Sequence, residues 1–229
     1  MDPGIKELKI VTLDLILLRE PAGIRPTAVD CMVLPHATSH PTDFNEHTAA
    51  HGKNWTKWLG HLIGKTHVSG LELGTWKGDS AEWMLTHIFT GFANNYECVD
   101  TFEGSEEHAL AGIDCSALEQ ETREKLRKFS PFVKIHKTTS DAFLRSCPRM
   151  FDFIYVDAAH DSMNVLRDAV LAFDLLKPNG TMIFDDYQWT VMPNPLDCPK
   201  IGVDAFVSAY AKQIEVIGMG WQLAVRKVA

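Results

Sequence analysis

The chain has 229 residues, of which 45% are hydrophobic and 23% charged, and its formal net charge is −8. This length accommodates one or two domains with a sizeable core, and the composition is that of a globular protein rather than a disordered one. The negative charge argues against generic nucleic-acid binding, which depends on contacts of Lys and Arg with phosphate.

The first 54 residues have the least regular pattern. The run over residues 10–18 contains Asp14 and is too short and too polar for a signal peptide or a membrane span. The five cysteines are an odd number without a C-x-x-C pair, which favours a reducing compartment, and we expect a cytoplasmic protein. Four histidines between positions 36 and 51 match no structural zinc pattern. We expect residues 1–54 to be an extension, either a lid over a pocket or an arm of a homodimer.

A helix is predicted over residues 55–63, with Asn54 as its N-cap, and a buried strand over residues 68–73. Residues 74–78 are predicted to form a tight glycine loop, and a second helix begins directly after it. This order of strand, glycine loop and helix is typical of a nucleotide-binding α/β unit.

The glycine loop carries the pattern E-x-G-x-x-x-G over residues 72–78. A dinucleotide enzyme uses the closely spaced pattern G-x-G-x-x-G to bring a pyrophosphate onto a helix N-terminus. The third glycine is missing here, and Glu72 near the strand end disfavours phosphate and suits an ammonium or a hydroxyl donor. The loop therefore argues against a nicotinamide oxidoreductase.

A second short strand, residues 96–99, ends in Asp100. This aspartate follows Gly74 by 26 residues, near the position where nucleotide-binding α/β proteins place an acid against the ribose hydroxyls. Phe102, just beyond, is a candidate to cover an adenine face. The elements predicted next are a charged helix, a third strand and a short helix, over residues 118–129, 132–136 and 142–147.

Residues 151–187 contain one arrangement twice, a short apolar strand that ends abruptly in acid. The first strand precedes Asp157 and the second precedes Asp185 and Asp186, with an amphipathic helix between them and a turn at residues 177–180. Such a crossover makes the strands parallel, so both end at the sheet edge where ligands bind. Three carboxylates gathered there repel one another unless a cation such as Mg²⁺ or Mn²⁺ is present. We expect a metal site, although isolated strand-end aspartates also cap helices and turns.

The remaining chain is expected to line a substrate pocket and to add the last strands of the sheet. Residues 187–200 form a long loop with three prolines, and Trp189 within it offers a surface for a substrate ring. A helix over residues 202–212 follows, and residues 214–217 and 221–226 are predicted to form a β-hairpin.

The chain from about Trp55 to its end resembles the class I S-adenosylmethionine-dependent methyltransferases. It is most similar to the divalent-metal-dependent O-methyltransferases of small molecules, in particular the branch with the sugar O-methyltransferases of macrolide and aminocoumarin biosynthesis. The resemblance rests on four segments in this order: LELGTWKGDS at 71–80, CVDTF at 98–102, FDFIYVDAAHDSMNVLRDAVLAFDLLKPNG at 151–180 and IFDDY at 183–187. It implies that residues 55–229 form an α/β methyltransferase domain. Its Rossmann-like, doubly wound sheet would have seven mostly parallel strands, with one antiparallel strand from the C-terminal hairpin.

The resemblance also implies which residues bind S-adenosyl-L-methionine and a divalent metal, Mg or Mn. The methionine end and the glycine loop would involve Glu72, Gly74, Thr75, Gly78 and Ser80. The ribose would be held by Asp100, and the residues near the adenine would be Phe102, Ser140 and Asp141. The metal ligands would be Asp157, Asp185 and Asp186. In the catechol and caffeoyl-CoA relatives the last ligand is typically Asn and a Lys stands three positions after the first Asp, whereas this chain has Asp186 and His160 there.

The implied reaction is methyl transfer to a hydroxyl of a small molecule, such as a vicinal diol of a sugar or a catechol-like ring. A metal bound by Asp157 and by two substrate oxygens would lower the pKa of the hydroxyl, and His160 would take its proton. Asp161 is the weaker candidate base, and a helix-start histidine without a catalytic role is the alternative. An iron oxygenase using Asp157, His160 and Asp185, or a catalytically silent cofactor-binding domain, also remains open. We expect no nucleic-acid or membrane partner.

Overall fold

The computed structural model describes residues 44–105, 108–109, 111–189 and 198–228. Its centre is a seven-stranded sheet with the order β3-β2-β1-β4-β5-β7-β6. The strands are β1 (Ser69–Leu73), β2 (Asn95–Asp100), β3 (Val133–Lys137), β4 (Phe151–Val156), β5 (Leu176–Phe184), β6 (Ile214–Met219) and β7 (Leu223–Lys227). Neighbours from β3 to β5 pair in parallel, and β7 pairs antiparallel with both β5 and β6. The predicted seven-stranded sheet with one antiparallel strand from the hairpin is confirmed.

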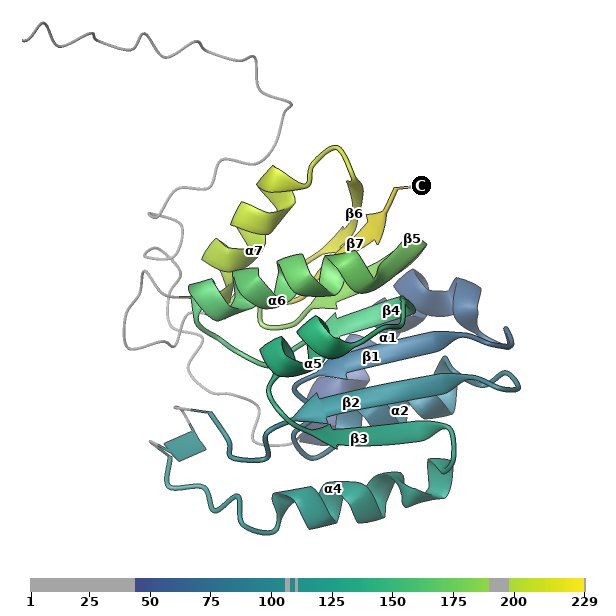
Figure 1. Ribbon diagram of the computed structural model, residues 1–229, viewed down its shortest axis with the longest axis vertical. Coiled ribbons are helices and arrows are strands. Elements are labelled where there is room, and N and C mark those ends of the chain that lie inside the picture. Colours follow the sequence, from purple (N-terminus) through teal and green to yellow (C-terminus); the bar gives the residue numbers. More distant parts are fainter. Residues whose placement is uncertain (1–43, 106–107, 110, 190–197, 229) are drawn as a thin grey trace, which may run out of the picture.

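Helices cover both faces of this sheet (Figure 1). One face carries α5 (Ser140–Ser146), α6 (Ser162–Leu175) and α7 (Pro199–Ala209). The other carries α1 (Phe44–Leu59) with the 3-10 turn η1 (Gly60–Leu62), α2 (Asp79–His87), and α4 (Leu118–Leu126) with the 3-10 turn η2 (Arg127–Phe129). Within the described residues, no helix has the length and apolarity needed to cross a bilayer.

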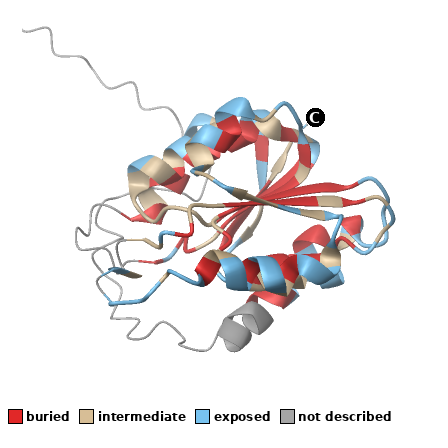
Figure 2. Cartoon of the chain, turned by 60° about the horizontal axis from the view of Figure 1, so that its bottom comes forward, coloured by how far each residue is buried: buried red, intermediate tan, exposed pale blue. Residues whose placement is uncertain are grey.

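The core lies in two layers, one on each face of the sheet, because the central parallel strands are covered on both sides. Figure 2 shows the buried strands between the two helix layers. Phe173 of α6 and Phe206 of α7 pack together in one layer, and Trp55 of α1 and Met84 of α2 lie in the other. Strand β1 is buried along its whole length, so the loops that follow the central strands are attached to a rigid base.

The first described helix begins earlier than the sequence predicts. Helix α1 starts at Phe44, so Asn54, the predicted N-cap, lies inside it. Gly52 does not end the helix, because it lies where α1 packs against α2: a Cβ at Gly52 would come within 2.9 Å of the Trp83 ring. The proposed lid or dimer arm falls mainly on residues 1–43, which are outside the described residues.

The predicted turn at residues 177–180 is an irregularity within strand β5. The pairing of β4 with β5 shifts there, since Phe151 pairs with Leu176 whereas Phe153 pairs with Thr181. Asn179 takes the positive φ of 64° that a tight turn requires. Most of the loop predicted over residues 187–200 lies outside the described residues, and α7 begins at Pro199, three residues earlier than predicted.

Candidate active site

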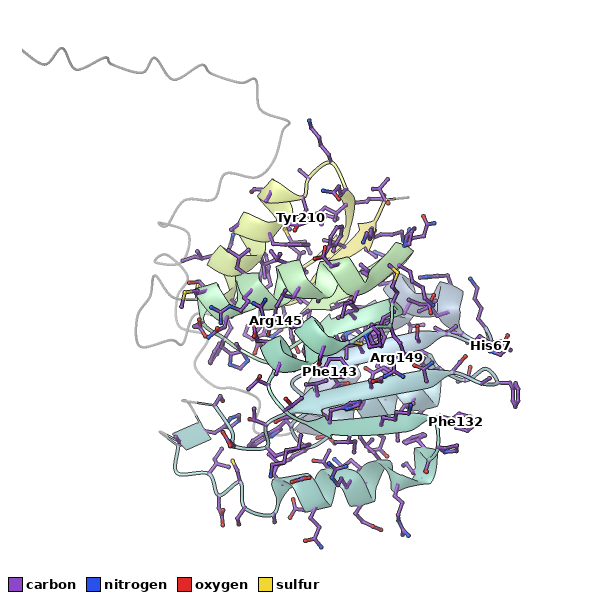
Figure 3. All side chains as sticks on the ribbon, in the orientation of Figure 1. His67, Phe132, Phe143, Arg145, Arg149 and Tyr210 are labelled. Carbon is purple, nitrogen blue, oxygen red and sulfur yellow. The ribbon has the colours of Figure 1, made fainter. Side chains whose placement is uncertain are left out.

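A cavity of about 580 Å³ opens at the edge where the parallel strands end. Figure 3 labels His67 and Phe132 at the opposite edge, where β1 and β3 begin. The cavity volume is in the range of small-molecule sites. The strand-end residues that line it are Thr138–Asp141 after β3, Asp100 and Thr101 at β2, Gly74 and Trp76 after β1, Asp157–His160 after β4, and Asp185 and Asp186 after β5.

Asp100 holds the glycine loop against strand β2. Its Oδ2 accepts hydrogen bonds from the backbone N–H groups of Thr75 (2.8 Å) and Trp76 (2.7 Å), and its Oδ1 accepts one from Phe102 (2.6 Å). Gly74 has a φ of 84°, and a Cβ there would lie 2.0 Å from the carbonyl oxygen of Asp157. The close approach of the two strand ends therefore requires glycine at this position.

Trp76 covers part of the cavity and was not predicted as a site residue. Its backbone has a φ of 48°, and its indole stacks on the His108 imidazole with centroids 3.9 Å apart. Thr122 Oγ1 donates a hydrogen bond to the Trp76 carbonyl at 2.7 Å. The sequence gives no signal for this stack, because the positive φ and the partner 32 residues away both depend on the tertiary structure.

Glu72 lies behind the glycine loop and outside the lining of the large cavity. It is fully buried, and its two carboxyl oxygens accept hydrogen bonds from Ser80 Oγ (2.7 Å) and the Tyr96 hydroxyl (2.8 Å). Burial raises the pKa of Glu72 to about 8, against the lowering effect of these two hydrogen bonds. In this arrangement Glu72 links strand β1 to helix α2 and to β2.

The other residues expected at the methionine end also lie around this loop. Gly78 precedes helix α2 with a φ of 76°. Thr75 and Ser80 line a second, smaller hollow of about 50 Å³, whose wall also includes Asp157 and Asp185. Phe102, predicted to cover an adenine face, is buried and does not line the large cavity.

Asp157, His160 and Asp186 form a compact group at one end of the cavity. One ligand atom from each lies within 4.8 Å of the others. His160 Nε2 is 3.2 Å from Asp186 Oδ2 and 3.8 Å from Asp157 Oδ1. Trp221 Nε1 donates a hydrogen bond to Asp186 Oδ1 at 2.9 Å. Burial, and then the charge of Asp185, raise the pKa of Asp157 well above its usual range.

Asp185, the third predicted metal ligand, is not part of this group. Its Oδ2 accepts a hydrogen bond from the Tyr155 hydroxyl, and its Oδ1 accepts one from Gln222 Nε2 at 3.1 Å. The Oε1 of the same Gln222 accepts a hydrogen bond from Trp55 Nε1 at 2.8 Å. The structure therefore brings Asp157 and Asp186 together with His160, and it places Asp185 in a buried network with α1, β4 and the residue preceding β7. Nothing in the sequence marks Gln222 as part of this network.

At the other end of the cavity, Ser140 and Asp141, which the sequence predicts near the adenine, begin helix α5 and line the wall. Asp141 Oδ2 is 2.9 Å from Arg145 Nε, and Asp141 Oδ1 is 4.0 Å from Arg167 Nε. Asp168 of α6 lines the same end and was not predicted. The sequence feature that could have identified Asp168 is a charged residue at a position where the helical periodicity predicts a buried side chain.

The strand order, the single antiparallel strand and the cavity over the central strand ends define the fold of the class I methyltransferases. Residues 71–187 match a family model described as a methyltransferase domain. Because the match spans just over half of the 229 residues, the chain belongs to this family. It is an S-adenosylmethionine-dependent methyltransferase, as the resemblance implies.

Solved structures of low sequence identity share this fold. A presumed O-methyltransferase from Klebsiella pneumoniae is 19% identical with a TM-score of 0.55, over 84% of each chain. TomG from Streptomyces achromogenes, an O-methyltransferase of tomaymycin synthesis in complex with S-adenosylmethionine, is 14% identical with a TM-score of 0.53, over 88% of this chain and 86% of TomG. The O-methyltransferase NovP is 16% identical with a TM-score of 0.54, over 80% of this chain and 79% of NovP. No curated protein matched the sequence.

Proposed function

We propose that this methyltransferase transfers the methyl group to a hydroxyl of a small molecule with two neighbouring oxygens, a vicinal diol of a sugar or a catechol-like ring, with the help of a divalent metal. The observation that carries the proposal is the group of Asp157, His160 and Asp186 at one end of the large cavity. Oxygen as the acceptor is supported by the names of similar structures, which include the O-methyltransferases TomG and NovP.

The donor set fits a hard divalent cation. Two carboxylates and one imidazole within 4.8 Å suit Mg²⁺ or Mn²⁺. Burial and the charge of Asp185 raise the pKa of Asp157, and a cation bound beside this carboxylate would favour its ionised form. Bound by Asp157 and Asp186, the cation would supply the Lewis acidity that lowers the pKa of a substrate hydroxyl. The hydrogen bond from Trp221 fixes the orientation of the Asp186 carboxylate.

The cofactor would occupy the cavity along the strand ends, and its sulfonium would supply an electrophilic methyl group. Gly74 lines this cavity, and because it has no Cβ the chain after β1 can lie against the backbone of Asp157. Asp100 Oδ1 accepts one hydrogen bond from the protein, which leaves capacity for a ribose hydroxyl. The end of the cavity near Ser140 would then receive the adenine, and the reactive sulfur would lie toward Asp157.

The residue that would accept the hydroxyl proton is His160. Its Nε2 lies beside the carboxylates of Asp157 and Asp186, and both would stabilise the imidazolium that forms. Its ring packs at 72° to the Trp189 ring with centroids 4.4 Å apart, which restricts the orientation of the imidazole. The same position also allows His160 to be a third metal ligand, and the effect of His160→Gln on metal binding separates the two roles.

The iron oxygenase alternative is not favoured. It requires Asp185 as a ligand, whereas Asp185 accepts hydrogen bonds from Tyr155 and Gln222. The group found in the described part of the chain has one histidine and two carboxylates, not the two histidines and one carboxylate typical of such oxygenases.

The test is calorimetric titration of chelator-treated protein with S-adenosylmethionine and, separately, with Mg²⁺ or Mn²⁺, followed by methyl transfer to a panel of diols. Asp186→Asn should keep cofactor binding and weaken metal binding at least about tenfold. A matched control is Asp174→Asn, which removes an exposed carboxylate of α6. His160→Gln should keep metal binding and lose turnover, and a loss of metal binding would instead make His160 a ligand. Unchanged metal binding by Asp186→Asn would contradict the metal site.

A further inference from the structure

Tyr187 directly follows Asp186 and connects the end of strand β5 to helix α7. Its side chain is buried, with 3% of the residue exposed, and its hydroxyl donates a hydrogen bond of 2.8 Å to Asp204 Oδ1. Asp204 is a buried residue of α7, and its Oδ2 accepts a hydrogen bond from Lys200 Nζ at 2.5 Å. The same Nζ lies 5.0 Å from the centroid of the Tyr187 ring. The tyrosine, the aspartate and the lysine therefore form one polar cluster in the first half of α7.

The backbone beside this cluster has a conformation that needs support. Asp186 has a φ of 52°, which residues with a side chain rarely adopt and which the surrounding structure must maintain. The N–H of Trp189 donates a hydrogen bond of 2.8 Å to the Asp186 carbonyl and closes a turn. The ring of Trp189 packs against His160. The turn over residues 186–189 thus carries one carboxylate of the proposed metal site and the ring that borders its histidine, and Tyr187 ties this turn to α7.

The first half of α7 also lies against the beginning of α6. A Cβ at Gly202 would come within 2.3 Å of the Ser162 carbonyl oxygen, so the close approach of the two helices requires glycine. Ser162 is the first residue of α6 and follows His160 by two positions. One turn further along α7, Phe206 packs against Phe184, the last residue of β5, with centroids 5.5 Å apart. Figure 1 shows α7 alongside α6 on one face of the sheet. Helix α7 is therefore packed against the chain on both sides of the proposed metal site.

The cluster itself does not touch a ligand in the large cavity, because its three residues are not among the described residues that line the cavity. Metal ligands depend on groups that fix their orientation, and loss of such a group typically weakens metal binding by about 10- to 100-fold. We propose that Asp204 is a positioning residue. Through the hydroxyl of Tyr187 it holds the turn over residues 186–189 so that the Asp186 carboxylate faces the other two members of the metal site. This inference rests on the metal site of the proposed function.

The test is titration of the full chain with Mn²⁺, in which the electron paramagnetic resonance signal of free Mn²⁺ gives the affinity. Tyr187→Phe removes only the hydroxyl and should weaken Mn²⁺ binding about tenfold, while the affinity for S-adenosylhomocysteine stays within about twofold. Tyr96→Phe is the matched control, because it also removes a buried tyrosine hydroxyl that donates to a carboxylate, Glu72 Oε2, at 2.8 Å. Both variants should unfold more easily, but only Tyr187→Phe should lose Mn²⁺ affinity.

Variants of Asp204 test whether the effect passes through this one hydrogen bond. Asp204→Ala removes the acceptor and should weaken Mn²⁺ binding as much as Tyr187→Phe does. Asp204→Asn keeps an amide oxygen for the tyrosine hydroxyl and should stay within about threefold of the wild type. In the double variant Tyr187→Phe/Asp204→Ala, the loss should not exceed that of either single change, because both remove the same contact.

Wild-type Mn²⁺ affinity in Tyr187→Phe, or an equal loss in Tyr96→Phe, would overturn the proposal. If Tyr187→Phe does not fold, the two variants of Asp204 decide, and equal Mn²⁺ affinities of Asp204→Ala and Asp204→Asn would contradict the role of the hydroxyl. No Mn²⁺ binding by the wild type would reject the proposed metal site, and this inference with it.

Discussion

Replacing Glu72 by glutamine should make the stability of the protein less sensitive to pH. Glu72 is fully buried between β1, α2 and β2, and burial raises its pKa to about 8 from an ordinary value of 4.5. Because the folded state keeps the proton that the unfolded chain releases, this carboxyl makes the free energy of unfolding fall as the pH rises from about 4.5 to about 8. Below this window the contribution is fully present, and above it the loss is complete.

The magnitude follows from the two pKa values. They differ by about 3.5 pH units, and each unit corresponds to about 1.4 kcal/mol, so the loss amounts to at most about 5 kcal/mol. Glutamine has no proton to release, and its Oε1 can still accept the hydrogen bond from Ser80. The difference in unfolding free energy between Glu72→Gln and the wild type should therefore increase by several kcal/mol between pH 5 and pH 9.

The assay is urea unfolding at pH 5, 7 and 9, followed by fluorescence of the tryptophans. Glu215→Gln, which changes an exposed glutamate of β6, is the control and should follow the wild type at every pH. A difference between Glu72→Gln and the wild type that stays constant across this range would refute the assignment of a raised pKa. Cofactor affinity in the same samples tests the position of Glu72, since a residue outside the cavity lining should change it only a few fold.

Three further changes test other parts of the site. Gly74→Ala should destabilise the protein by about 2 kcal/mol or more in urea unfolding. The reason is that the φ of 84° and the 2.0 Å approach to Asp157 leave no room for a methyl group. Gly220→Ala is the control, because the space around Gly220 is open. Gln222→Ala should cost about 1–3 kcal/mol, because it leaves buried partners without a hydrogen bond, and an unchanged unfolding midpoint would contradict the network. Removal of metal by a chelator should abolish methyl transfer and leave S-adenosylhomocysteine affinity within a few fold, and turnover that survives chelation would contradict metal assistance.

Much of the fold was predictable because it depends on local patterns. Apolar runs that end in acid and a helical stripe between them predict parallel strands, and the glycine loop over residues 72–78 predicts the first turn of the nucleotide-type unit. The start of α1 was not predictable, because Gly52 looks like a helix breaker until its contact with Trp83 is known. Asn54 matches the residue type of an N-cap and yet lies within a helix whose packing outweighs local preference.

The sequence predicts which strand ends converge at the site, but it does not predict the direction in which each side chain points. Asp185 and Asp186 directly follow strand β5, and the backbone leaves the extended conformation at Asp186, where φ is positive. Asp185 faces Tyr155, whereas Asp186, at a φ of 52°, faces His160. The sequence of two aspartates predicts two ligands, whereas backbone geometry separates their roles. Asp168 was missed for a related reason, because helical periodicity alone does not tell whether a buried acid faces the core or a cavity.

The hydrogen bond between Trp55 and Gln222 has a consequence for the synthesis of the protein. The two residues are 167 positions apart, and the same glutamine also donates hydrogen bonds to Tyr155 and Asp185. A ribosome-bound chain that ends before the last hairpin lacks this glutamine, and closing so long a loop costs entropy that only later contacts offset. The parallel part of the sheet can assemble first, but Asp185 obtains its full set of partners only when the hairpin docks. The same hairpin carries Trp221, which donates a hydrogen bond to Asp186 of the proposed site, so catalytic competence should appear as one of the last events of folding.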